Sequence, residues 1–253
     1  MLGRYRWHSN HAASPGPDRP ARARRILGSV PQFFNLALLL NNGTALAWGA
    51  VETLALGGAA LALSFVFGLA GWLCKASRRR PLAWLGFGYV ELFRNTPTLV
   101  YLYLFYFGLP MIGVRLGAFV YAMLAIGIQG GAYVTEIFRG AYAAVGEDQR
   151  LAARALGLRH WQSLALVELP QMFCVAFPAL GNQVISTVLG TALASVIAVP
   201  ELTYQLQIIG DSTYQYFSVF SMDAIAYLIL VQILNQSFQA ADRRWFGKWR
   251  SGR

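Results

Sequence analysis

Two copies of one short pattern place an acidic and a basic residue three positions apart, as Glu91-Leu-Phe-Arg94 and Glu136-Ile-Phe-Arg139. Residues three apart on a helix share a face, so each carboxylate can form an ion pair with the guanidinium of its own copy. Such pairs can anchor helices where a membrane meets water, or they can close a passage between crossing helices. The pattern alone leaves both interpretations open.

Uncharged polar side chains recur inside otherwise apolar stretches, and four of them are Gln129, Asn182, Gln183 and Thr187. In a membrane helix such groups commonly hydrogen-bond a neighbouring helix, and less often they contact a solute that passes between helices. They are therefore candidates for a translocation path, with bonding between helices as the alternative.

A charged, amphipathic segment covers residues 147–170. Glu147 and Asp148 suit the start of a helix, where carboxylates oppose the helix dipole. Gly157 is placed to end that helix in a left-handed conformation, and Pro170 is expected to end a second amphipathic helix. Because the segment is too polar to enter lipid, we predict a helix–turn–helix that docks a partner in the cytoplasm.

No arrangement of residues indicates catalysis or a metal site. The three histidines are scattered, and Cys74 and Cys174 lack the spacing of a disulfide or metal framework. A glycine-rich loop that could hold the phosphates of ATP is also absent. We therefore expect no enzymatic activity, no metal and no cofactor on this chain.

The stretches that carry these residues are long and apolar. Of the 253 residues 56% are hydrophobic and only 13% are charged, against about 25% charged in a typical soluble domain. Five stretches contain no charged residue, namely 53–74, 95–114, 116–135, 169–200 and 224–241. A membrane-spanning helix needs about 20 mostly apolar residues. The sequence thus predicts an all-α integral membrane protein with about five transmembrane helices, over 51–74, 90–109, 118–139, 171–199 and 219–239, and a loop over 140–170.

The net charge of +10 is concentrated between the apolar stretches. Basic residues follow the first and third predicted helices and fill the tail at 241–253, whereas only Arg115 follows the second and none follows the fourth. Such loops stay in the cytoplasm, which predicts a multi-pass protein of a bacterial inner membrane with a cytoplasmic C-terminus. A nucleic-acid-binding protein would instead carry its basic residues as a patch on a soluble face, so no nucleic acid is expected.

The N-terminal region fits this orientation poorly. Residues 1–30 are basic and proline-containing and are expected to be a disordered arm without a cleavable signal peptide. Asn41, Asn42 and Gly43 interrupt the half-apolar segment 31–49, which is expected to lie in the membrane interface. Five crossings would place the basic arm outside. The alternatives are an additional short membrane element over 26–40, or a natural start further downstream.

Four ordered blocks carry a family resemblance. Ala152, Ala153 and Gly157, followed by Val-x-Leu-Pro ending at Pro170, resemble the EAA loop of binding-protein-dependent ABC importer permeases. The blocks 90–110, 135–141 and 194–203 resemble the polar amino-acid branch of that family, which carries histidine, glutamate, glutamine, arginine or opines. The resemblance covers roughly residues 45–240.

The resemblance implies a type I ABC importer fold and a permease subunit that forms the path for polar amino acids or opines. It implies four kinds of partner: membrane lipid, a cytoplasmic ABC ATPase that holds ATP and Mg, a second permease subunit that is identical or homologous, and a periplasmic amino-acid-binding protein. The residues that would couple to the ATPase are Ala152, Ala153, Gly157, Leu158, Trp161, Leu169 and Pro170.

Three features depart from the family pattern, and one is Arg150, which stands where a bulky apolar or aromatic residue is usual. Leu151 stands where the loop usually has its glutamate, and Glu147 or Asp148 could replace that carboxylate. In the fourth predicted helix a polar, charged pattern is reduced to Leu-Gly-Thr-Ala-Leu, which leaves Thr191 as a candidate for the path. The alternative function is a secondary transporter or channel, but ion coupling requires ionisable residues inside the spans, which are rare here. The sequence specifies neither the amino acid nor the choice between homodimer and heterodimer.

Overall fold

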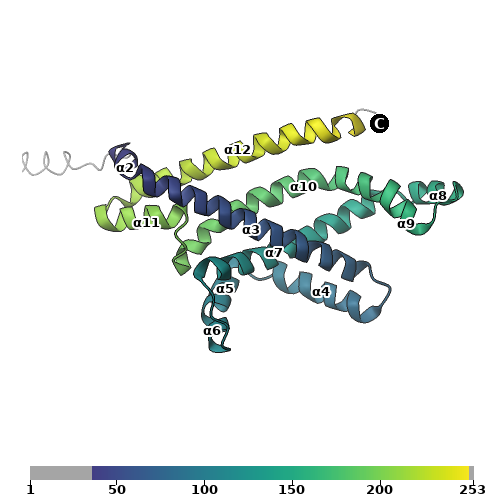
Figure 1. Cartoon of the computed structure of the whole chain (residues 1–253), viewed down its shortest axis with the longest axis horizontal. Helices are drawn as coiled ribbons and strands as arrows, with labels where there is room; N and C mark the ends of the chain where they lie inside the picture. Colours follow the sequence, from purple (N-terminus) through teal and green to yellow (C-terminus); the bar gives the residue numbers. More distant parts are fainter. Residues whose placement is uncertain (1–35, 251–253) are drawn as a thin grey trace, which may run out of the picture.

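The computed structural model describes residues 36–250, and all regular structure in that part of the chain is helical. The helices form an elongated bundle (Figure 1). The expectations for the arm at 1–30, for the start of the segment 31–49 and for the last three residues lie outside the described residues. The all-α fold class is confirmed for the rest.

The helical segments follow one another in a simple order. They are α2 (Leu36–Asn41), α3 (Gly43–Ala76), α4 (Arg80–Arg94), α5 (Thr98–Tyr103), the π-helix η1 (Leu104–Gly108), α6 (Leu109–Met111), α7 (Ala118–Ala144), α8 (Glu147–Ala155), α9 (His160–Ser163), the π-helix η2 (Leu164–Glu168), α10 (Leu169–Gly190), the 3-10 helix η3 (Thr191–Ile197), α11 (Leu202–Thr213) and α12 (Tyr216–Arg250).

Four helices are long and apolar enough to cross a membrane: Gly43–Ala76, Ala118–Ala144, His160–Ile197 and Tyr216–Trp245. The first of them begins earlier than the predicted helix over 51–74, because α3 starts at Gly43 and includes residues 43–49. The interfacial position expected for those residues stays a prediction. Gly49 explains the extension, since it is buried where a side chain would meet Leu202 and Gln205. The predicted tail also differs, because α12 continues as a helix to Arg250.

The predicted second helix over 90–109 is wrong in its continuity. The chain forms α4 up to Arg94, loses helical structure over 95–97 and resumes as α5, η1 and α6. Pro97 supplies the reason, because proline cannot donate a backbone hydrogen bond and disfavours a helical conformation at the residue before it. α5 and α6 project from the side of the bundle (Figure 1).

The most extensive packing in the molecule joins α3 to α7. The close pairs advance together along both helices, from Gly127 against Leu63 to Gly68 against Val134, so the two helices run in the same direction. Glycine allows this approach, since a Cβ at Gly68 would clash with the Val134 side chain. Because α3 and α7 are parallel, the chain between them must cross back, and it does so through α4, α5, η1 and α6.

The expectation that Pro170 ends an amphipathic helix before the membrane is also wrong. Helical structure continues from His160 to Ile197, and Pro170 lies in the first turn of α10. The preceding five residues form η2, a π-helix. A widened turn accommodates a proline inside a helix because the backbone bonds near it are rearranged.

The far end of α10 leads through η3 to α11 and α12. Glu201 is fully buried there and caps α11, accepting hydrogen bonds from the backbone N–H groups of Thr203 (3.0 Å) and Tyr204 (2.8 Å) and from the Tyr227 hydroxyl (2.8 Å). Burial raises the pKa of the Glu201 carboxyl, while these hydrogen bonds oppose the rise. This capped turn holds α11 against α3 and α12.

The two ends of the bundle differ in what they carry. α8 and α9 lie at one end, toward which the C-terminus also points, whereas α2 and α11 lie at the opposite end (Figure 1). α7 and α10 both run along the bundle toward the end that carries α8 and α9 (Figure 1).

Candidate functional site

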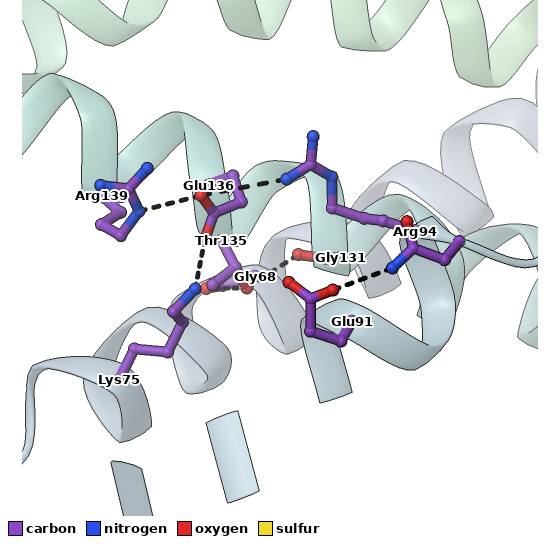
Figure 2. A network of polar contacts seen from close by, with 9 residues as sticks. Gly68, Lys75, Glu91, Arg94, Gly131, Thr135, Glu136 and Arg139 are labelled. Atoms are coloured by element: carbon purple, nitrogen blue, oxygen red, sulfur yellow. Dashed lines mark hydrogen bonds and ion pairs between the residues drawn. The ribbon is translucent and has the colours of Figure 1, made fainter. Parts of the chain in front are cut away.

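One carboxylate on α7 gathers three cations from three helices (Figure 2). Glu136 Oε1 lies 2.5 Å from Lys75 Nζ of α3, and its Oε2 lies 2.9 Å from Arg139 Nε and 3.9 Å from Arg94 Nη1 of α4. The Lys75 side chain is only 8% exposed, while those of Arg94 and Arg139 are 41% and 54% exposed. Glu136 thus connects α3, α4 and α7 electrostatically.

The sequence pattern anticipated half of this cluster. Glu136 and Arg139 pair as their spacing predicts, and both copies of the pattern are neighbours. The expected pair between Glu91 and Arg94 does not form: Arg94 turns to Glu136, and the Glu91 carboxylate accepts a hydrogen bond from Asn95 (2.9 Å). Lys75 was missed because it reads as one of several basic residues after the first apolar stretch.

Arg94 lies at the end of a helix, where the sequence predicted the start of one. It was expected at the cytoplasmic start of a helix, but it ends α4, one helix length from Arg80. Its guanidinium stacks 5.3 Å from the ring centroid of Tyr133, near the middle of α7. A cation over an aromatic face is stabilised by the ring quadrupole, which holds Arg94 beside α7.

A polar pocket of about 320 Å³ adjoins this cluster between α5, α7 and α10. Tyr133, which carries Arg94 on its ring, forms part of its wall. Six of the nine lining residues carry a hydroxyl or amide group; the lining is Thr98, Ile126, Gln129, Gly130, Tyr133, Gln183, Ser186, Thr187 and Gly190. A pocket of this size with convergent polar groups is typical of a small-molecule site.

Gln129 serves the fold as well as the pocket wall. Its Nε2 donates to the backbone oxygens of Thr96 (2.8 Å) and Phe93 (3.2 Å), and its Oε1 accepts from the Thr98 hydroxyl (2.5 Å). These partners belong to the break between α4 and α5, where backbone carbonyls have lost their helical donors. Gln129 therefore hydrogen-bonds the chain around this break and also forms one side of the pocket.

The other predicted path residues divide into two groups. Gln183 and Thr187 line the pocket, and Gln183 Nε2 lies 3.3 Å from Thr187 Oγ1. Asn182 faces a separate, smaller cavity between α10 and α12, and Thr191 is fully buried with its hydroxyl bonded to the Val188 carbonyl. Thr98, Tyr133 and Ser186 were missed, since single hydroxyl residues carry no periodic signal.

The predicted coupling segment begins with the turn that the sequence indicated. Gly157 follows α8 with φ +78°, and its N–H donates to the Arg154 carbonyl (2.9 Å) while that of Leu158 donates to the Ala153 carbonyl (3.1 Å). This is the left-handed helix end that favours glycine. Of the predicted coupling residues Ala153 is buried, Leu158, Leu169 and Pro170 are half-buried, and Ala152 and Gly157 are exposed.

Large apolar side chains are exposed on this segment. Leu156 is 82% exposed and Trp161 is 64% exposed, and Leu151 is also exposed. These residues lie at the polar end of the bundle, where α8 carries Glu147 and Asp148 in its first turn. Exposed apolar side chains on a charged segment are typical of an interaction surface.

A second carboxylate is buried in the same region and forms no ion pair with any residue of 36–250. Glu168 ends η2 and is fully buried, and it accepts hydrogen bonds from the hydroxyls of Tyr142 (Oε2, 2.7 Å) and Ser163 (Oε1, 2.9 Å). The Arg150 guanidinium of α8 lies 5.3 Å from the Tyr142 ring centroid. No sequence pattern indicated this site, because Tyr142 and Ser163 belong to no motif.

Residues 36–250 contain no group of three or more His, Cys, Asp or Glu side chains that could hold a metal ion.

Comparison with known proteins decides the family. Residues 67–247, more than two thirds of the chain, match the family described as "Binding-protein-dependent transport system inner membrane component". The chain belongs to this family. It is accordingly a multi-pass inner-membrane component with the permease fold, as the EAA-like spacing implied.

Individual members of this permease family are similar over most of the chain. The probable glutamine ABC transporter permease protein GlnM of Bacillus subtilis is 34% identical over 210 residues, which cover 83% of this chain and 97% of GlnM. The glutamine transport system permease protein GlnP of Escherichia coli K12 is 37% identical over 158 residues, 62% of this chain and 72% of GlnP.

Solved structures agree with the family. An amino acid ABC transporter crystallised with histidines superposes with a TM-score of 0.79 at 33% identity, covering 83% of this chain and 98% of that chain. The inward-facing MetNI methionine ABC transporter matches at 21% identity with a TM-score of 0.67, which supports the type I importer fold. These matches are components of ABC transporters, not secondary transporters or channels.

Proposed function

We propose that this permease carries polar amino acids across the inner membrane through the pocket between α5, α7 and α10, driven by a separate ATPase. This proposal is supported most directly by the polar residues that line the pocket. Its wall places Gln183, Ser186 and Thr187 opposite Tyr133, about midway along α7. Polar groups inside a membrane bundle favour a polar solute, because lipid offers them no hydrogen-bond partners.

The charge beside the pocket favours a solute with a carboxylate. Arg94 is 3.9 Å from its carboxylate partner, is partly exposed and stacks on a pocket residue. The other two cations around Glu136, Lys75 and Arg139, lie closer to its carboxylate than Arg94 does. An amino acid in the pocket would meet hydroxyl and amide groups for its polar atoms and positive charge for its carboxylate.

The partners follow from the same assignment. The exposed apolar residues Leu151 on α8, Leu156 directly after it and Trp161 on α9 form the surface that the ATPase would cover. ATP and Mg would be held by that ATPase, a second permease subunit would complete the path, and a periplasmic amino-acid-binding protein would deliver the solute. Because the C-terminus points toward the end that carries α8 and α9, both would be cytoplasmic.

Uptake by the reconstituted complex tests the proposal. The chain would be placed in lipid vesicles with its ATPase and binding protein, and uptake of radiolabelled amino acids would be measured with and without ATP. We expect ATP-dependent uptake that falls about tenfold in Gln183→Leu, which removes one solute hydrogen bond. The matched control is Gln232→Leu on α12, whose side chain is exposed outside the pocket.

Two results would overturn the proposal. Uptake that proceeds without ATP along an ion gradient would support the secondary transporter instead. Equal uptake by Gln183→Leu and Gln232→Leu would remove the pocket from the path.

A further inference from the structure

Glu168 and Tyr142 connect the segment α8–α9 to the membrane helices. The Tyr142 hydroxyl of α7 donates to Glu168 Oε2 (2.7 Å), directly before α10 begins. Ser163 of α9 donates to the other carboxylate oxygen (2.9 Å). A single fully buried carboxylate therefore ties together α7, α9 and the start of α10.

The ring of Tyr142 adds two further elements to this connection. On α8, Arg150 places its guanidinium 5.3 Å from the ring centroid, and on α3, Trp72 packs edge-to-face at 5.6 Å. Tyr142 therefore contacts Arg150 of α8 with its ring and Glu168, next to α10, with its hydroxyl. These contacts form a continuous chain from α8 to α10.

The backbone at this point explains why a tie is needed. η2 is a π-helix that ends at Glu168, and Pro170 follows two residues later. A widened turn with rearranged hydrogen bonds is a less rigid link than an α-helix. A force applied at α9 would be absorbed in that turn unless a side-chain contact fixed it to a neighbouring helix.

The choice of a carboxylate points the same way. Burying Glu168 with two hydroxyl donors, and without an ion pair among residues 36–250, is expensive compared with an apolar side chain. One buried carboxylate that accepts from both hydroxyls holds Tyr142 and Ser163 in a defined position relative to each other. The exposed Leu151 on α8 cannot supply a carboxylate for this purpose.

We propose that the Tyr142–Glu168 hydrogen bond is the joint that transmits movement of α8 and α9 to α7 and α10. Both are positioning residues: they touch neither the pocket nor the exposed docking surface. The proposal rests on the proposed function, since it assumes that an ATPase moves α8 and α9. It assigns the transmission to a contact inside this chain.

The test measures the amino acid taken up per ATP hydrolysed by the reconstituted complex. Tyr142→Phe and Glu168→Leu are each expected to lower this ratio about tenfold while the ATPase stays bound and active, because each removes the same buried hydrogen bond. The double variant Tyr142→Phe/Glu168→Leu should be no worse than either single variant. Glu168→Gln should retain most of the ratio, since an amide can still bond both hydroxyls.

The matched control is Tyr204→Phe on α11. The Tyr204 hydroxyl has no hydrogen-bond partner among residues 36–250, so this variant should behave as the unmodified chain. An unchanged ratio in Tyr142→Phe with the ATPase bound would overturn the joint, as would additive losses in the double variant.

Hydrogen–deuterium exchange on the full chain alone separates this proposal from the proposed function. Faster exchange over 147–159 in Tyr142→Phe than in Tyr204→Phe is expected, and equal exchange would overturn the joint. If the unmodified chain bound no ATPase in the reconstitution, that result would contradict the proposed function and not the joint.

Discussion

Two carboxylates reach the second half of α7, and the structure satisfies them in opposite ways. Glu136 is surrounded by Lys75, Arg94 and Arg139, whereas Glu168 is held by the neutral hydroxyls of Tyr142 and Ser163. Both sites bind three helical segments to one another. The difference is the kind of donor, and it determines how each site should respond when one partner is removed.

The free-energy cost of losing one partner differs between an ion-pair cluster and a set of neutral hydrogen bonds. Removing a carboxylate from among cations leaves a buried charge without a counter-ion, which a membrane bundle tolerates poorly. Removing Glu168 leaves two neutral hydroxyls unsatisfied and breaks no direct ion pair among the described residues, although Arg150 lies near the Tyr142 ring. Glu136 should therefore matter most for stability, and Glu168 should matter most for the position of α8 and α9.

Glu136→Leu is expected to have the largest effect. It leaves the Lys75 ammonium, 8% exposed, without its partner at 2.5 Å, so the free energy of unfolding should fall by about 3–5 kcal/mol. Unfolding of the detergent-purified chain by heat or denaturant measures this loss. A loss no larger than that of Glu168→Leu would break the proposed difference between the two sites.

Glu168→Leu should be milder, with a loss of about 1–3 kcal/mol from two unsatisfied hydroxyls. Replacing the donors as well, in Tyr142→Phe/Ser163→Ala/Glu168→Leu, should restore most of the stability, because no polar group is then left unpaired. The same unfolding measurement applies. If the triple variant were less stable than Glu168→Leu, hydroxyl satisfaction would be the wrong description of this site.

Gly157→Leu should act on the segment that Glu168 positions. A leucine at φ +78° would be strained by about 1–2 kcal/mol, although no neighbouring atom obstructs it. We expect a lower yield of ATPase in a pull-down with normal membrane insertion. Gly140→Leu is the control, since Gly140 is also exposed and unobstructed but lies within α7 without a positive φ. ATPase recovery at the unmodified level with Gly157→Leu would contradict the docking assignment.

Arg139→Gln should have the smallest effect. Its side chain is 54% exposed, and exposed ion pairs contribute roughly 0–1 kcal/mol that salt screens further. The unfolding midpoint should shift slightly at low ionic strength and not at high ionic strength. A large shift that persists in high salt would mean that Arg139, and not Lys75, is the principal partner of Glu136.

The sequence predicted what depends on local pattern. Long uncharged stretches indicated the membrane helices, and a spacing of three predicted the pair of Glu136 and Arg139. Gly157 ended its helix as expected, because a left-handed residue after a helix is a local preference. Motif spacing also indicated the family that the comparisons established.

What it could not predict depends on distant contacts. Lys75 joins Glu136 only because glycines bring α3 and α7 together, and Gln129 is needed because the chain breaks after α4. Pro170 was expected to end a helix, but a π turn carries the helix through it. The Glu168 site could not be predicted, since a lone glutamate among apolar residues does not indicate which side chains donate hydrogen bonds to it.

The most direct test of the central claim is the side from which the pocket is accessible. Ser186→Cys, in a chain with Cys74→Ala and Cys174→Ala, places one thiol in the pocket wall. In the reconstituted complex a membrane-impermeant thiol reagent would be applied from either side, with and without trapped ATP. An ATP-driven permease predicts labelling from one side in each state, with the side reversed by ATP. Labelling from both sides at once, or from the same side in both states, would contradict it.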